Sequence, residues 1–182
     1  MRKLINLLTL LTLFFTTAGA EELTATLDMT TSQTSPVTVN GVTFSWNNSN
    51  SYVVTGAGNS SGFQSGADMT VTLPEGATLI NISKTNGGSW GSNATITVYA
   101  GSTYNGTPVI ASIVQGNNSY NISSNNTGGI FYFENISGKN AFIRSLSIKY
   151  YISSTKYNVI CNENIDNGSI SANPTRQLRM QL

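Results

Sequence analysis

The chain has 182 residues, and charged residues make up only 9% of them, far below the roughly 25% of an ordinary globular domain. Nine Lys or Arg against eight Asp or Glu give a formal net charge of +1. This near-neutral balance argues against electrostatic binding to nucleic acid or to an anionic membrane surface. The absence of histidine excludes the commonest general base and every Ser–His or Cys–His nucleophile.

The chain opens on a pattern typical of a secretory signal peptide, over residues 1–20. Arg2 and Lys3 supply the positive start, an apolar stretch follows, and Ala18-Gly19-Ala20 supplies the small residues before a cleavage point. The apolar stretch is short for a membrane anchor. We therefore expect a cleaved leader, no membrane span in the mature chain, and a secreted, cell-surface or periplasmic location.

The first half of the mature chain shows strands with a period of two. Leu23 to Met29 alternates apolar and Thr residues. Val37 and Val39 lead into Asn40-Gly41, and Val42 and Phe44 lead out, which predicts a tight hairpin with Val39 opposite Val42 and Val37 opposite Phe44. Further strands are predicted at 52–55, 69–73 and from 79, with loops at 56–66 and 86–93.

The second half repeats the pattern. Residues 94–100 alternate, Asn105-Gly106 indicates a turn, and the return strand 108–114 is expected to bury Val109, Ala111 and Ile113. The apolar run 130–133 indicates a strand buried on both faces.

The last strand, residues 141–152, has one break in its alternation. Leu146 and Ile148 share a face from which Ile143 is out of phase, and a β-bulge would return Ile143 to the core and turn Arg144 outward. Many short strands without an amphipathic helix predict an all-β fold. We expect residues 21–152 to form an antiparallel two-sheet β-sandwich, jelly-roll-like, followed by a linker (153–156) and the truncated start of a second β module (157–182).

Two resemblances follow from these motifs. The strand ending PEGA, the NGGSWG loop, ATITVYAG and the final IRSLSIKYY resemble β-sandwich modules of large secreted or surface proteins of Bacteroidetes bacteria. YNVICNENIDNGSISANPT, residues 157–175, is similar to the opening of bacterial Ig-like, internalin-type B repeats, although the pattern stops after Thr175. Together they imply a sandwich fold in a bacterial surface module, and they imply no catalytic residues.

Catalytic and metal chemistry finds little support in the sequence. No pair of acidic residues has the spacing of a known catalytic motif, and Glu75 and Glu134 are expected to be solvated. Cys161 is the only cysteine and is interpreted as a small core residue or an unpaired one. We expect no enzyme activity and no cofactor. A structural calcium ion stays open, with Asp68, beside a Gly-rich loop, as its best ligand.

Aromatic side chains are the remaining candidates for ligand binding, because the C–H face of a sugar packs on aromatic rings. Trp90 in its Gly- and Ser-rich loop, Tyr104 before a turn and Tyr120 in a polar segment are the candidates. The alternative for Trp90 is that it folds back to cap the core. Trp46, Phe131, Phe133 and Phe142 are expected in the core. The sequence thus favours a non-catalytic module that binds carbohydrate or another surface ligand, or else a structural spacer or adhesin stalk.

Overall fold

The computed structural model describes residues 20–47, 52–104, 107–123 and 129–152. The expected leader, the Asn105-Gly106 turn, the linker and the second module, with Cys161, therefore lie outside the described residues. Within them, strands dominate and the one short 3₁₀ turn, η2, covers Gly58–Ser60. No helix in the part of the chain that the structure describes has the length and apolar character needed to cross a membrane.

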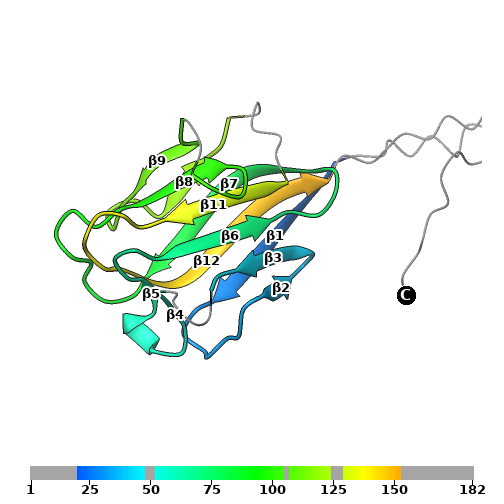
Figure 1. Cartoon of the computed structure of the whole chain (residues 1–182). Helices are drawn as coiled ribbons and strands as arrows, with labels where there is room; N and C mark the ends of the chain where they lie inside the picture. Colours follow the sequence, from blue (N-terminus) through cyan, green and yellow to red (C-terminus); the bar gives the residue numbers. More distant parts are fainter. Residues whose placement is uncertain (1–19, 48–51, 105–106, 124–128, 153–182) are drawn as a thin grey trace, which may run out of the picture. The chain divides into compact units, whose positions relative to one another are not determined.

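The strands form two antiparallel sheets, which Figure 1 shows lying one over the other. The first sheet has the order β10-β7-β12-β5-β4, with β1 also paired to β12, and the second has the order β2-β3-β6-β11-β8-β9. The strands of the first sheet are β1 (Glu21–Asp28), β4 (Val53–Val54), β5 (Gly62–Phe63), β7 (Ala77–Asn86), β10 (Ser119–Asn121) and β12 (Ala141–Ile152). Those of the second are β2 (Val37–Val39), β3 (Val42–Ser45), β6 (Asp68–Thr72), β8 (Ile96–Ala100), β9 (Ile110–Ile113) and β11 (Ile130–Glu134).

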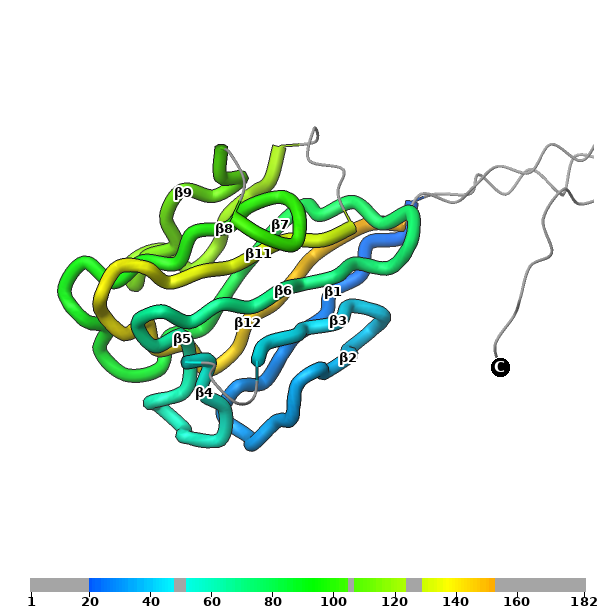
Figure 2. Tube along the Cα trace, viewed as in Figure 1, coloured from blue at the N-terminus to red at the C-terminus, as the bar shows by residue number. Residues whose placement is uncertain are grey.

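The pairing follows the nested pattern of a jelly roll. β1 pairs with β12, β6 with β11, β7 with β10 and β8 with β9, so each pair lies inside the previous one along the chain. Figure 2 shows β1, in blue, running beside β12, in orange, although they lie at opposite ends of the domain sequence. Two nested Greek keys of this kind define the double-sheet jelly roll, which confirms the predicted fold class.

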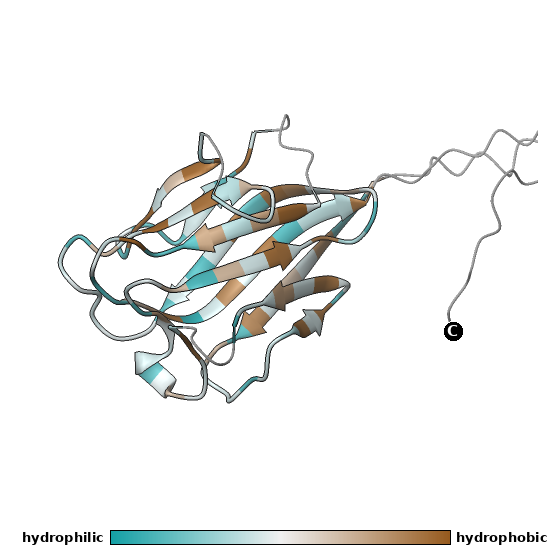
Figure 3. Cartoon of the chain, in the orientation of Figure 1, coloured by the Kyte–Doolittle hydropathy of each residue, from teal (hydrophilic) through white to brown (hydrophobic). Residues whose placement is uncertain are grey.

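The core lies between the sheets and takes alternate residues from each strand. Met69, Val71 and Leu73 of the β6 region and Leu146, Ile148 and Tyr150 of β12 are buried as predicted. Figure 3 shows the resulting alternation of apolar and polar residues along the strands. Trp46, Phe131 and Phe133 also lie in the core, whereas Phe142 is half-buried against it.

Two local predictions are confirmed in detail. In the β2–β3 hairpin, Val39 pairs with Val42 and Val37 with Phe44, around Asn40 and Gly41, which both have positive φ, as a type I′ turn requires. In β12 the register shifts between Ile143 and Ser145, and Arg144 is exposed while Ile143 is buried. The extra residue therefore makes the expected bulge.

Three local predictions are wrong. In β9, Ile110 and Ile113 are buried and Ala111 is exposed, because the register with β8 shifts between Ile96 and Val98. β11 is fully buried only on the face that carries Phe131 and Phe133; on the other face Ile130 is exposed, Tyr132 is half-buried and only Glu134 is buried.

The third concerns the expected loop 56–66, which contributes the short strand β5. Gly62 has φ of +135°, and a Cβ there would lie 2.4 Å from the Ala141 carbonyl oxygen. The missing side chain lets β5 pair closely with β12 and bury Phe63 completely. Only glycine fits this contact.

Candidate functional site: a pocket beside Trp90

Trp90, the leading aromatic candidate, is buried in the core and does not present an open face to solvent. Its side chain is 8% exposed, and its indole Nε1–H donates to the Phe142 carbonyl oxygen at 2.5 Å. A buried indole N–H normally has such a partner. The ring therefore caps one end of the sandwich, which is the alternative that the sequence left open.

Lys84 of β7 lies against the same ring. Its Nζ is 4.7 Å from the ring centroid of Trp90, within the range of a cation–π interaction. The ammonium also donates to Asn86 Oδ1 at 2.6 Å and Asn118 Oδ1 at 3.0 Å. Burial lowers the pKa of Lys84 to about 8, because these neutral oxygens compensate only in part for the hydration that the ammonium loses.

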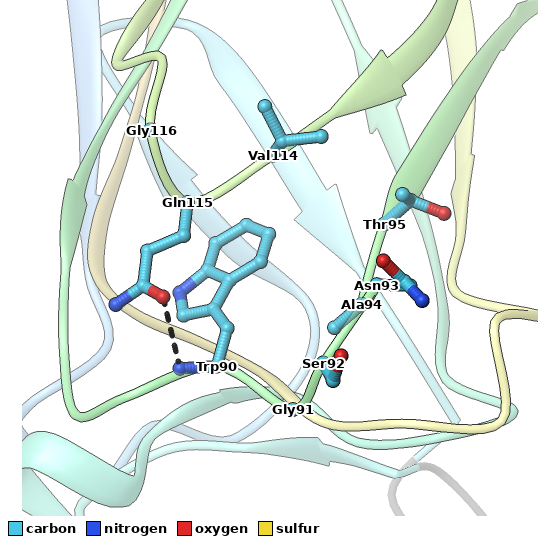
Figure 4. Close-up of a pocket in the computed structure, with 9 residues that line it drawn as sticks. All are labelled: Trp90, Gly91, Ser92, Asn93, Ala94, Thr95, Val114, Gln115 and Gly116. Atoms are coloured by element: carbon cyan, nitrogen blue, oxygen red, sulfur yellow. Dashed lines mark hydrogen bonds between the residues drawn. The ribbon is translucent and has the colours of Figure 1, made fainter.

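A pocket of about 390 Å³ opens beside the buried indole. Figure 4 shows the ring of Trp90 between Gln115 and Val114 on one side and the segment from Asn93 to Thr95 on the other. The complete lining consists of Trp90, Gly91, Ser92, Asn93, Ala94, Thr95, Val114, Gln115 and Gly116. The volume lies within the range of small-molecule sites.

Two loops at the ends of β8 and β9 build this pocket. Residues 90–95 lead into β8, and residues 114–116 leave β9, so the pairing of these strands brings the loops together. The Trp90 backbone N–H donates to Gln115 Oε1 at 3.4 Å, which links the loops. Asn93 adopts a φ of +64°, a left-handed conformation that Asn tolerates better than most residues.

The chemistry of the lining is polar and uncharged. Ser92, Asn93, Thr95 and Gln115 offer hydroxyl and amide groups, while Trp90 and Val114 provide apolar surface. None of the lining residues carries an acid or base that titrates near neutral pH. The pocket is therefore suited to hydrogen bonding with a neutral polar ligand.

The two tyrosine candidates lie outside this pocket. Tyr120 is half-buried, and its hydroxyl accepts from the Val114 N–H at 2.8 Å and donates to the Asn117 carbonyl at 3.1 Å. It thereby holds the turn that leads away from the pocket. Tyr104 is 64% exposed and makes an edge-on contact with Tyr99, at 4.9 Å between ring centroids. The structure brings neither into the lining.

Sequence reasoning singled out the Trp90 loop but missed its partner. Gln115 and Gly116 follow a strand with an irregular register, and nothing in their local pattern points to the Trp90 loop. The Asn and Gly in VQGN indicate a turn, which is the only available signal.

The acidic residues are arranged differently from the expectation. Glu75 is exposed as predicted, whereas Glu134 is 9% exposed and its Oε1 is buried without a hydrogen-bond partner in the described structure. No group of three or more His, Cys, Asp or Glu residues placed to hold a metal occurs among the described residues.

Comparisons with protein-family models, with curated proteins and with solved structures found no match for this chain. The interpretation of its function therefore depends on the geometry of the site and on the sequence.

Proposed function

We propose that this chain is an exported, non-catalytic β-sandwich module that binds a neutral saccharide in the pocket beside Trp90. The observation that carries the proposal is the pocket of about 390 Å³ whose lining combines an indole edge with uncharged hydrogen-bonding side chains. Saccharides present both C–H faces and hydroxyl groups, so they require apolar contact together with donors and acceptors.

The placement of the indole limits its part in binding. Its N–H is already paired with Phe142, and Lys84 lies over the ring. Trp90 therefore contributes a rigid wall to the pocket, while Gln115, Asn93 and Ser92 would supply most of the hydrogen bonds. This division predicts modest affinity, because a broad stacking surface is missing.

The export of the chain rests on the leader pattern in residues 1–20 and the resemblance to bacterial surface modules. Sequencing the N-terminus of the protein recovered from a bacterial host's periplasm or medium tests it. A mature chain that begins at Glu21 supports export. An intact Met1 in the cytoplasmic fraction contradicts it.

A glycan array probed with the full chain tests saccharide binding, with isothermal titration of each hit. We expect binding to neutral glycans, weakened in Gln115→Ala and unchanged in Glu22→Gln, whose side chain forms a surface ion pair with Lys149. Binding that is confined to charged glycans, or that Gln115→Ala leaves unchanged, contradicts the proposed pocket.

A structural spacer is the second candidate, and the burial of Trp90 together with the fixed hydroxyl of Tyr120 favours it. Trp90 is 8% exposed and Tyr120 has its hydroxyl fixed by the adjacent turn. A stable full chain that binds nothing on the array would support this alternative and exclude the saccharide proposal.

A further inference from the structure

A second group of polar side chains lies on the outer face of the second sheet. Unlike the lining of the Trp90 pocket, this group includes carboxylates. Glu134 of β11 pairs in register with Asp68 of β6 on one side and with Thr97 of β8 on the other. Side chains paired in this way on one face have Cβ atoms about 4.5–5.5 Å apart. Two carboxylates are therefore direct neighbours on adjacent strands.

The Glu134 carboxylate is only partly compensated, because Tyr99 hydrogen-bonds to it and one of its two oxygens still lacks a partner. Glu134 is nine-tenths buried, and its Oε1 has no hydrogen-bond partner in the described structure. An ion pair among the described residues joins Lys149 to Glu22, on strands other than β6 and β11. Like charges directly opposite one another destabilise a sheet, and a buried carboxylate is costly without a partner. A cation would remove both penalties.

The groups around Glu134 carry oxygen donors. Tyr132 pairs in register with Thr70 of β6 and with Tyr99 of β8, so their phenols and hydroxyl share the same outer face. The Tyr99 hydroxyl hydrogen-bonds to the Glu134 carboxylate, and the Tyr132 hydroxyl to the Asp68 carboxylate. A set of oxygen ligands without nitrogen or sulfur suits hard cations.

We propose that Asp68 and Glu134 bind a calcium ion on the outer face of the second sheet. The two carboxylates supply up to four oxygens, and water supplies others of the six to eight ligands that Ca²⁺ takes. A bare ion fits better than an organic ammonium. The unpartnered oxygen is buried, so a bulky group would have to displace the atoms that shield this oxygen from solvent. Mg²⁺ binds more weakly, since it demands a near-ideal octahedral site.

Terbium luminescence and thermal unfolding of the full chain test this site. Tb³⁺ replaces Ca²⁺ and emits when a nearby tyrosine or tryptophan transfers energy to it, and Tyr99 and Tyr132 neighbour the carboxylates. We expect sensitised emission that excess CaCl₂ removes, and a rise in Tm with CaCl₂ that exceeds the rise with MgCl₂ at equal concentration.

Two variants and a control decide the assignment. Glu134→Gln and Asp68→Asn keep the side-chain size, and each should weaken Tb³⁺ binding at least about tenfold, a loss that even outer-shell changes cause at metal sites. Glu134→Gln should also raise the Tm without metal, because it removes a buried charge. Glu22→Gln should behave as the wild type.

The absence of sensitised emission from the wild type would overturn the proposal. So would emission that persists in both Glu134→Gln and Asp68→Asn, or Tm shifts that are equal for the two salts. Because Glu134→Gln is expected to fold at least as stably as the wild type, its loss of binding would not be an effect of unfolding.

Discussion

The Trp90 pocket and the Asp68–Glu134 pair both involve β8, yet they differ in every property that selects a ligand. The pocket lies where β8 begins, is hollow, and is lined by uncharged side chains from two loops. The carboxylate pair lies on the paired strands β6 and β11, beside β8, and its Glu134 is buried. The two loops therefore enclose a pocket with an uncharged lining, whereas the sheet holds two carboxylates side by side.

The largest expected effect is the loss of stability and of saccharide binding caused by Trp90→Ala. Trp90→Ala removes a core side chain, its hydrogen bond to the Phe142 carbonyl and its cation–π contact with Lys84. We expect it to lower the free energy of unfolding by about 3 kcal/mol, measured by urea denaturation, and to abolish saccharide binding. The calcium-dependent rise in Tm should remain, and its loss would show that the two regions are not independent.

Trp46→Phe is the matched control for this variant. Trp46 is equally buried in the core but does not line the pocket. We expect a smaller loss of stability and unchanged saccharide binding. A loss of binding equal to that of Trp90→Ala would mean that any damage to the core closes the pocket.

The next effect is a dependence of folding stability on pH that arises from Lys84. The pKa of Lys84 is lowered from 10.5 to about 8 in the folded state, so between these values the unfolded chain binds more protons. Stability should therefore rise as the pH increases from about 8 towards 10. Differential scanning calorimetry across this range checks the slope.

Lys84→Met removes the titrating group and should flatten this rise. The raised pKa values of Tyr99, Tyr132 and Tyr150 oppose it only above about pH 10, where tyrosines in the unfolded chain ionise. A wild-type Tm that falls between pH 8 and 10 would contradict the buried position of Lys84.

Gln115→Ala tests the hydrogen bonds of the pocket with little cost to the fold. Its long 3.4 Å contact with the Trp90 N–H predicts a stability loss below about 1 kcal/mol. Loss of one ligand hydrogen bond should weaken saccharide binding about five- to tenfold, measured by titration calorimetry. Unaltered affinity would place the ligand elsewhere.

Tyr104→Ala should have the smallest effect on stability and on saccharide binding. Its side chain is largely exposed and contacts Tyr99 edge-on, so the change in stability should stay within about 0.5 kcal/mol. Binding in the Trp90 pocket should be unchanged. A marked loss of saccharide affinity would move the site to Tyr104, as the sequence alone allowed.

The sequence predicted those features that depend on neighbouring residues. The Asn40-Gly41 turn and the alternation around it fix the β2–β3 register, and one break in alternation locates the bulge at Arg144. Both are local patterns with a physical cause. They suffice for the fold class, because a two-sheet sandwich is the usual way to bury many alternating strands.

The site depends on partners that are distant in the sequence. Glu134 reads locally as a solvated strand end, and its burial follows from pairing with Thr97 and Asp68. The loop pattern allows Trp90 to be either open or folded back on the core, and contacts with Phe142 and Lys84 fix the buried position. Alternation assigns each residue to a face, but it does not say which strands become neighbours.

The most direct test is an NMR titration of the ¹⁵N-labelled full chain with neutral hexasaccharides of glucose, xylose, mannose and galactose, added separately. The account predicts that at least one of them shifts the amide signals of Gly91, Ser92, Asn93, Gln115 and Gly116, while those of Asp68 and Glu134 stay in place. Shifts centred on Asp68 and Glu134, or no shift with any of the four, would contradict a saccharide site beside Trp90.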